Sequence, residues 1–204
     1  MSAVHIALHG KMESGKNYTA DAISELVNEL TGGKVPVAQY AFATKLKVSG
    51  MKSLGFDGPD EDLVQMANEI KERGTVQVKL ANKVVKKITG REFWQFTGTE
   101  GGREIHGKDV WVNLAMAQVV PTGVAVFTDC RFPNEATSTR ATDGGVVWHV
   151  VGPEDDTGDH PSEQVLPPEL IDFTIDNTVR DDNGERLKEQ LRKLIIDHPL
   201  IPTE

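Results

Sequence analysis

The feature that most constrains the fold is a glycine-rich segment directly behind a short apolar run. The run covers residues 4–8, and the segment from Gly10 to Asn17 fits the spacing Gly-x-x-x-x-Gly-Lys, which ends on Gly15 and Lys16. A strand, a glycine-rich turn and a helix in this order are typical of a phosphate-binding loop, whose backbone N–H groups and helix N-terminus face an anion. The alternative is a glycine-rich turn that only caps a helix. The flanking strand and helix favour the phosphate loop.

Two residues of this segment have predicted roles in binding a nucleotide and its metal. Lys16 opens the helix and is expected to reach the outer phosphates of the nucleotide. Asn17 stands where such loops usually carry Ser or Thr, whose hydroxyl binds Mg²⁺. An amide oxygen can also bind a hard cation, and Thr19 lies close by, so Asn17 is a candidate metal ligand.

Apolar runs and helical stretches alternate along the chain. Helical periodicity marks residues 17–30 and 184–197. Five apolar, β-branched runs are expected to be strands: residues 4–8, 37–41, 124–128, 146–151 and 172–175. This alternation predicts a doubly wound α/β fold, in which helices cover both faces of a parallel sheet.

The connection between the second and third expected strands, residues 42–122, is too long for a simple crossover. Helices are expected within it at residues 45–53, 61–73, 76–88, 92–96 and 109–119. Residues 42–108 carry twelve Lys or Arg against nine Asp or Glu, whereas the rest of the chain carries ten against twenty-two. We therefore predict one domain over residues 1–204, with a helical, locally basic insert that binds a small phosphorylated substrate.

The third expected strand ends in an acid, Asp129, and Arg131 follows two positions later. A phosphate loop needs a carboxylate for its metal, and a guanidinium suits a phosphoryl group, so these residues are predicted to complete the site. The alternative is a structural ion pair at the end of the strand. Cys130, between them, is expected to be a packed thiol, because a neighbouring carboxylate raises its pKa.

Within the insert, residues 95–103 form a segment rich in Gly and Thr that we expect to be a loop around a small polar ligand. Arg103 could hold a monophosphate, and Gln95 or Glu100 could bind a base or a sugar hydroxyl. Trp94 and Trp111 are expected to be core anchors in preference to stacking platforms.

Composition limits the remaining functions. The 204 residues carry a net charge of -9, which argues against a nucleic acid polymer as partner. No run approaches the ~20 apolar residues of a membrane span, and nothing at the N-terminus suggests secretion. A single cysteine fits a reducing compartment, so a cytoplasmic location is expected. The sequence leaves open whether the chain forms a homodimer.

A set of motifs in a fixed order resembles the bacteriophage-type deoxynucleoside monophosphate kinases, a P-loop kinase family. The resemblance covers nearly the whole chain. Its motifs are Gly10 to Asn17, Phe42-Ala-Thr-Lys45-Leu-Lys47, Gln95-x-x-Gly98-Thr99-Glu100-x-x-Arg103, Asp109-x-Trp111, Asp129-x-Arg131-Phe-Pro-Asn134-Glu135 and His160-x-Ser162-Glu163.

The resemblance implies a P-loop kinase fold with strand order 2-3-1-4-5, ATP and Mg²⁺ as cofactors, and a deoxynucleoside monophosphate as phosphoryl acceptor. If the protein is phage-encoded, its location is the host cytoplasm. Catalysis would depend on Lys16, Asp129 and Arg131, and the metal would be held by Asn17 and Asp129. The implied ATP-binding residues are Gly10, Lys11, Ser14, Gly15, Lys16, Asn17, Tyr18 and Asn177, with residues 175–177 near the base. The implied acceptor-binding residues are Lys47, Gln95, Thr99, Glu100, Arg103, Trp111 and Arg131.

One segment departs from the pattern of nucleotide kinases, which commonly close an arginine-bearing lid over the phosphates. The corresponding lid-like segment, residues 152–168, contains neither Lys nor Arg, and His160 is its only candidate cation. The transferring charge would then be met by Lys16, Arg131 and Arg103, with Arg140 as a further candidate.

Two other functions remain as alternatives. One is a P-loop kinase for another small phosphorylated acceptor, such as dephospho-coenzyme A. The other is a nucleotide-binding switch protein, although the Asn-Lys-x-Asp motif of a switch GTPase is absent from the sequence.

Overall fold

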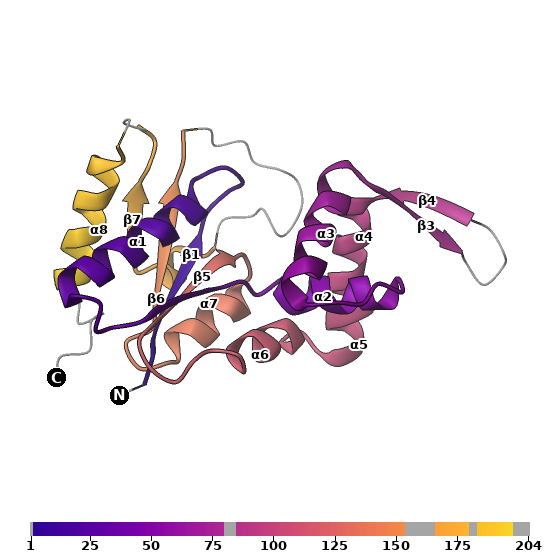
Figure 1. Ribbon diagram of the computed structural model, residues 1–204, viewed down its shortest axis with the longest axis horizontal. Coiled ribbons are helices and arrows are strands. Elements are labelled where there is room, and N and C mark those ends of the chain that lie inside the picture. Colours follow the sequence, from indigo (N-terminus) through magenta and orange to yellow (C-terminus); the bar gives the residue numbers. More distant parts are fainter. Residues whose placement is uncertain (1, 80–84, 154–165, 180–182, 198–204) are drawn as a thin grey trace. The chain divides into compact units, whose positions relative to one another are not determined.

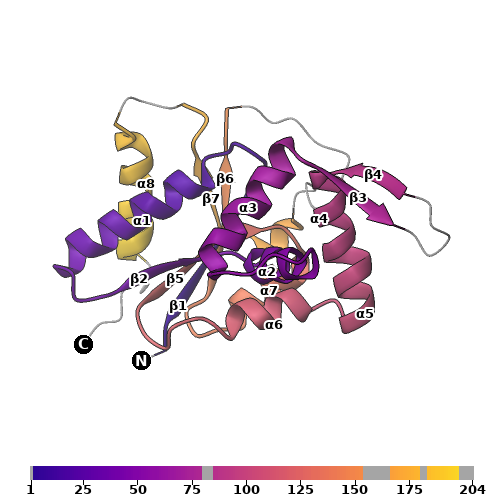
Figure 2. The same ribbon diagram turned by 45° about the vertical axis from the view of Figure 1, so that its right-hand side comes forward.

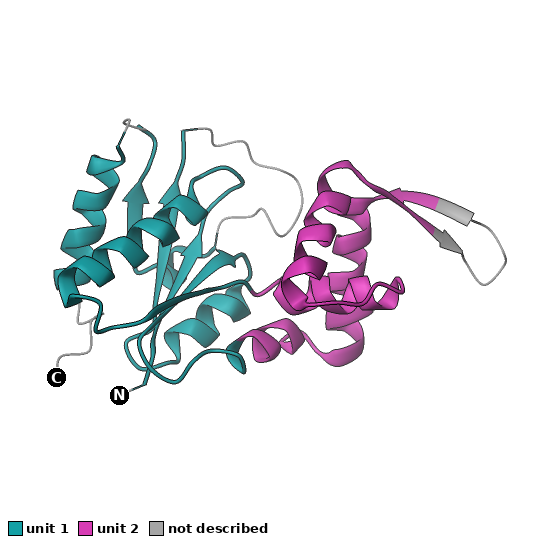
Figure 3. Cartoon of the chain, in the orientation of Figure 1, with its two compact units in different colours: residues 1–41, 116–204 teal, residues 42–115 magenta. Residues whose placement is uncertain are grey.

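The computed structural model describes residues 2–79, 85–153, 166–179 and 183–197. The chain divides into two compact units (Figure 3). The first unit contains residues 1–41 and 116–204, and the second contains residues 42–115. Among the described residues, no helix combines the length and the apolar character needed to cross a membrane.

A five-stranded parallel sheet forms the centre of the first unit (Figure 1). Its strands are β1 (Val4–His9), β2 (Val37–Tyr40), β5 (Val124–Cys130), β6 (Val146–Val151) and β7 (Phe173–Asp176). Each lies within two residues of an expected strand, so the predicted parallel sheet is confirmed. The spatial order is β2-β5-β1-β6-β7, which is 2-3-1-4-5 when these strands alone are numbered along the chain.

Helices cover both faces of this sheet (Figures 1 and 2). They are α1 (Lys16–Thr31), α7 (Pro133–Arg140) and α8 (Glu185–Asp197), and a short 3₁₀ turn, η3 (Pro168–Leu170), precedes β7. α1 and α8 lie side by side and share one apolar core with the sheet, to which α1 contributes Ile23 and Leu26 and α8 contributes Leu191. α7 lies on the opposite face. Because all strands are parallel, their carboxyl ends meet at one edge, where ligands of such sheets bind.

The second unit is mainly helical and has its own core. Its elements are α2 (Thr44–Ser53), α3 (Asp60–Arg73), β3 (Thr75–Lys79), β4 (Val85–Thr89), α4 (Gly90–Gly98), the π-helical turn η1 (Thr99–Arg103), α5 (Glu104–His106) and α6 (Val110–Met116), whose last residue belongs to the first unit. Met51, Leu63 and Phe93 pack together in the core with Trp94. The Trp94 indole N–H donates to the carbonyl of Ala67 at 3.1 Å, so a buried polar group is satisfied.

The helix expected over residues 76–88 is wrong, because β3 and β4 pair there as an antiparallel hairpin. Val76 lies opposite Ile88, and Val76 is only 9% exposed whereas the next residue, Gln77, is exposed. This period-2 burial suits β-branched residues, which pack well on a pleated surface and lose rotamer freedom in a helix.

The loop expected over residues 95–103 is also wrong, because the chain stays helical from α4 through η1. The glycines are explained by close packing. A Cβ on Gly98 would lie 3.2 Å from Leu46 Cδ2, and one on Gly102 would lie 2.4 Å from Trp111 Cζ2. Helical glycine costs about 1 kcal/mol relative to alanine, and here the close contact with an aromatic ring offsets that cost.

Gly102 and Gly101 provide a matched test of this packing. Gly102→Ala is expected to lower the free energy of unfolding by about 1–3 kcal/mol, because the new methyl group displaces the Trp111 ring. Gly101→Ala is the control, since its Cβ would meet only the Phe96 carbonyl at an ordinary 3.6 Å. Urea unfolding followed by tryptophan fluorescence measures both. Equal effects of the two substitutions would contradict the packing explanation.

Candidate active site

The predicted phosphate loop connects β1 to α1 at the carboxyl edge of the sheet, and two of its positions require glycine. Gly10 has a φ of 150°, and a Cβ there would lie 2.4 Å from the Val150 carbonyl oxygen. Gly15 has a φ of 95°, and its Cβ would lie 2.3 Å from Asn177 Nδ2. Side chains at either position would therefore be strained and would collide with neighbouring strand ends. The loop is packed tightly against β6 and the residue that follows β7.

The Lys16 side chain folds back over this loop. Its ammonium donates to the carbonyls of Gly10 at 2.8 Å and Lys11 at 2.5 Å, and it lies 3.5 Å from Ser14 Oγ. An ammonium has three donors and no acceptor, so the loop's own oxygens hold a positive charge at its centre. This is the place where the loop geometry would receive an anion.

The charges of Asp129 and Arg131 both act on Lys16. Burial above all, together with the Arg131 guanidinium, lowers the pKa of Lys16 to about 8, and the Asp129 carboxylate opposes the shift. The structure therefore brings together the two cations and the carboxylate that the sequence predicted for catalysis. Asp129 and Arg131 are both partly buried, where their charges are screened less than at an open surface.

The end of β5 is shaped by an irregularity in the sheet. The pairing of β1 with β5 shifts register between Ala7 and His9, so that Ala7 pairs with Phe127 but His9 pairs with Cys130. Two residues, Thr128 and Asp129, thus occupy a stretch opposite the single residue between Ala7 and His9. Such irregularities re-aim side chains and are frequent beside active sites.

Glu135 holds the backbone just after β5. It is 3% exposed, and its Oε2 accepts from the backbone N–H of Arg131 at 2.7 Å and of Phe132 at 3.0 Å. Sequence reasoning quoted Glu135 within a motif but gave it no role. Its position in the first turn of α7, two residues after Pro133, was the available signal, because an acid there binds free backbone donors.

The Cys130 side chain is buried beside these groups. Burial raises the pKa of its thiol, and the carboxylates of Glu135 and Asp129 raise it further. The expectation of a packed thiol at the end of the strand is confirmed.

Asn177 joins the carboxyl end of β7 to the loop. Its amide donates to the Ser14 carbonyl at 2.8 Å, and the side chain is 5% exposed. Tyr18 is directed elsewhere, since its hydroxyl donates to the carbonyl of Asn183 at 3.4 Å. Asn17 is exposed in the first turn of α1. The roles of these three residues in nucleotide binding stay predictions.

The predicted acceptor-binding residues lie in the second unit. Lys47 is on α2, Gln95 on α4, Trp111 on α6, and Thr99, Glu100 and Arg103 on η1. Trp111 is 7% exposed and donates its indole N–H to the Gly98 carbonyl at 2.9 Å, so it is a core anchor, as Trp94 is. The acceptor assignments stay predictions. A π-helical turn such as η1 is often found at functional sites.

Arg140 does not reach the phosphate loop. It ends α7, which runs from the carboxyl end of β5 back toward the start of β6. Its guanidinium bonds to the Glu169 carbonyl at 2.8 Å and to Asp172 at 3.1 Å, just before β7 begins. Arg140 therefore lies at the opposite edge of the sheet, and the prediction that it meets the transferring charge is wrong.

Most of the lid-like segment, including His160, Ser162 and Glu163, lies outside the described residues.

The arrangement fits a divalent cation through Asp129, whose carboxylate oxygens are the ligands that Mg²⁺ prefers. Within the described ranges, no group of three or more His, Cys, Asp or Glu side chains comes close enough together to form a complete protein cage. Mg²⁺ usually keeps several waters and uses one or two protein ligands beside substrate phosphates, so a sparse donor set is the expected one. Asn17 and Asp129 remain the candidate ligands.

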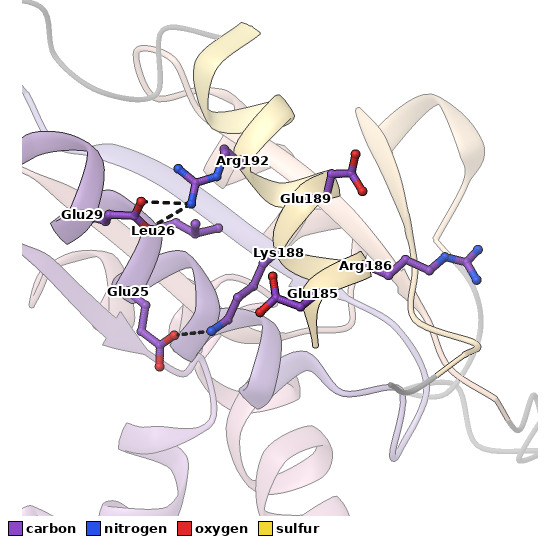
Figure 4. Close-up of a pocket in the computed structure, with 8 residues that line it drawn as sticks. All are labelled: Glu25, Leu26, Glu29, Glu185, Arg186, Lys188, Glu189 and Arg192. Carbon is purple, nitrogen blue, oxygen red and sulfur yellow. Dashed lines mark hydrogen bonds and ion pairs between the residues drawn. The ribbon is translucent and has the colours of Figure 1, made fainter. Parts of the chain in front are cut away.

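A surface depression between α1 and α8 is separate from this site (Figure 4). Ion pairs cross it, from Lys188 to Glu25 at 2.9 Å and from Arg192 to Glu29 at 3.0 Å. Both pairs join α8 to α1, and the α1 residues of the depression begin more than two helical turns beyond Lys16. The depression is the surface groove where α1 and α8 pack together. The loop between β1 and α1 remains the candidate active site.

Comparison with known proteins agrees with the motifs. No protein-family model matches the chain. The deoxynucleoside-5'-monophosphate kinase of Escherichia phage T5 is 31% identical to it over 110 residues, which cover 50% of this chain and 44% of that kinase. The chain therefore spans less than half the length of the curated relative that it matches. The resemblance to a deoxynucleoside monophosphate kinase of the phage type is confirmed over half of the chain.

Proposed function

We propose that this protein is a deoxynucleoside monophosphate kinase, which transfers the γ-phosphoryl group of ATP to a deoxynucleoside monophosphate. The observation that carries the proposal is the gathering of Lys16, Asp129 and Arg131 at a glycine-lined phosphate loop. The similarity to the phage T5 kinase supports the same reaction class.

The reaction needs positioning and charge neutralisation more than covalent chemistry. An oxygen of the acceptor phosphate attacks the γ-phosphorus in line, and the bond from that phosphorus to the bridging oxygen breaks. The bridging oxygen keeps the electron pair and leaves as part of ADP. The acceptor phosphate is already ionised, so no general base is required. Bound Mg²⁺ would neutralise charge on the phosphate oxygens, and Asp129 and Asn17 would hold it.

Each residue of the candidate site has a distinct part in this reaction. Lys16 would leave the loop carbonyls and bind the β- and γ-phosphates, and the loop N–H groups would cradle them. Arg131 would grip the transferring phosphoryl group with two N–H donors. Arg103 of the second unit would bind the acceptor phosphate. The locally basic composition of the insert supports this assignment.

The decisive experiment is a coupled assay of ADP formation with each deoxy- and ribonucleoside monophosphate, and with dephospho-coenzyme A, added in turn. We expect ADP to form only when a deoxynucleoside monophosphate is added, together with the matching diphosphate. ADP formation at the same rate without any acceptor would favour the nucleotide-binding switch. Activity confined to dephospho-coenzyme A would favour the other kinase class. Either result would contradict the proposal.

ATP binding should depend on pH through Lys16. Because the pKa of Lys16 is lowered to about 8, its amine is largely neutral in the free protein at pH 9, and the unfolded chain would keep it charged. A bound polyphosphate favours the ammonium, so binding above pH 8 takes up a proton and weakens as pH rises. Calorimetry in two buffers of different ionisation enthalpy should show proton uptake at pH 9 and almost none at pH 6.5. Lys16→Met should abolish the uptake, and uptake that persists would assign it to another group.

A further inference from the structure

His9 is the last residue of β1 and directly precedes the phosphate loop. It lies on the central strand, in register with Cys130 of β5 on one side and with His149 of β6 on the other. Its imidazole is 4% exposed and stacks on the His149 ring at a centroid distance of 5.0 Å. His9 is thus a buried histidine at the carboxyl edge of the sheet, with neighbouring strands on both sides.

Two hydrogen bonds fix the protonation state of His9. Nδ1 lies 3.1 Å from the carbonyl oxygen of Cys130, and the backbone N–H of Leu166 donates to Nε2 at 3.2 Å. A carbonyl can only accept and a backbone N–H can only donate, so Nδ1 carries the proton and Nε2 carries none. The ring is therefore neutral and in a single tautomer.

The positive charges around the ring favour the same state. Burial above all, together with the charges of His149, Lys16 and Arg131, lowers the pKa of His9 to about 4, against the opposing effect of the Cys130 hydrogen bond. An imidazolium at this place would face two cations of the candidate site. It would also lose the bond from Leu166, because a protonated Nε2 cannot accept.

The Cys130 carbonyl is the part of β5 that this ring controls. Cys130 stands between Asp129 and Arg131, at the point where the pairing of β1 with β5 resumes after its register shift. The backbone at a register shift loses ladder hydrogen bonds and needs another constraint. The imidazole N–H provides one, at the residue that joins the two predicted catalytic side chains.

We propose that His9 is a positioning residue: by holding the Cys130 carbonyl it fixes the directions in which Asp129 and Arg131 leave β5 toward Lys16. The inference rests on the proposed function, because it concerns the same site. Glu135 accepts from the N–H of the same peptide group, that of Arg131, and from the N–H of Phe132, so the peptide between Cys130 and Arg131 is held at both its carbonyl and its N–H.

Two substitutions separate the two hydrogen bonds of His9. His9→Asn places an amide N–H near the position of Nδ1, so it can keep the bond to Cys130. His9→Gln places its amide oxygen near the position of Nε2, so it can keep the bond from Leu166 but not the one to Cys130. We expect His9→Gln to lower kcat by about 10–100-fold, the range for losing a residue that orients catalytic groups, and His9→Asn to stay within about threefold of wild type. The dissociation constant of ATP should change little in either variant.

His5→Gln is the matched control, since His5 is another buried histidine of β1 but packs against Phe127. It should leave kcat unchanged, and urea unfolding of all three variants shows how much stability each loses. Equal losses of kcat in His9→Asn and His9→Gln would overturn the proposal. So would a larger loss in His9→Asn, or a loss in His5→Gln that matches His9→Gln at the same stability.

A measurement without turnover distinguishes this inference from the proposed function. Nitrogen-15 NMR of the histidine rings should show His9 as the neutral Nδ1–H tautomer, still neutral at pH 5.5. The Arg131 Nε–H resonance should shift in His9→Gln but not in His5→Gln. A wild-type protein without kinase activity that gives these spectra would contradict the proposed function alone. An Nε2–H tautomer, or an unmoved Arg131 resonance, would overturn the role of His9.

Discussion

Lys16→Ala should leave the fold intact and reduce turnover by about 10²-fold or more, the scale of losing one preorganised electrostatic contact. The ammonium is held at the centre of the loop by the carbonyls of Gly10 and Lys11, so the substitution removes the positive charge that the transferring phosphates would meet. Steady-state kinetics of ADP formation measures the loss, and circular dichroism checks the fold.

Lys188→Ala serves as the control for this result. Lys188 pairs with Glu25 on the surface between α1 and α8, and surface ion pairs contribute little to stability. Its removal should leave turnover unchanged. Near-normal turnover in Lys16→Ala, with the control also unchanged, would remove Lys16 from the site.

Arg131→Lys should also reduce turnover by about 10²-fold, with ATP affinity little affected, because the proposed contact is made to the transferring group. An ammonium keeps the charge but cannot reproduce the two-pronged grip of a guanidinium on phosphate oxygens. The backbone of Arg131 is fixed by its hydrogen bond to Glu135. The backbone therefore cannot shift to bring a lysine ammonium into the position of the guanidinium.

Arg192→Lys is the matched control for this substitution. Arg192 contacts both carboxylate oxygens of Glu29 on the surface of α8, at 3.1 and 3.0 Å, and lies outside the candidate site. Kinetics at saturating and limiting ATP separates turnover from donor binding. A collapse of ATP affinity with normal turnover at saturation would assign Arg131 to the donor and contradict its proposed role.

The parts of the structure that the sequence predicted are those written in local patterns. The glycine-rich loop between β1 and α1 was predictable because its glycines, its lysine and the flanking strand and helix are contiguous. Its binding of phosphate stays a prediction. The sheet was predictable because its strands are short β-branched runs separated by helices. Asp129 and Arg131 could be assigned to the same site because the carboxyl ends of parallel strands share one edge.

The errors arose where two patterns coincide or where packing overrides local preference. Val76, Leu80, Val84 and Ile88 recur every four residues, which favours a helix, yet Thr, Val and Ile are also good strand residues. The hairpin followed the second preference. Gly98 and Gly102 suggested a loop, but their lack of side chains allows Leu46 and Trp111 to pack closely against a helix.

Local sequence patterns could not predict the long-range hydrogen bonds that hold the candidate site, for a different reason. Asn177 is 163 positions from Ser14, and His9 is 121 positions from Cys130. A bond between such distant residues depends on the order of the strands, which no single segment specifies. Only after β1 is placed between β5 and β6 does a histidine at its end acquire two partners.

The strand order also determines when the protein can fold as it is synthesised. β1 and β2 lie within the first 41 residues but pair with β5 and β6 and not with each other. Residues 42–115 form an uninterrupted unit with its own core (Figure 3), so that unit can be complete before β5 has left the ribosome. The bond from Asn177 to Ser14 must wait until residue 177 has been made. The loop between β1 and α1 is therefore made before residues 42–115 but set in place after them.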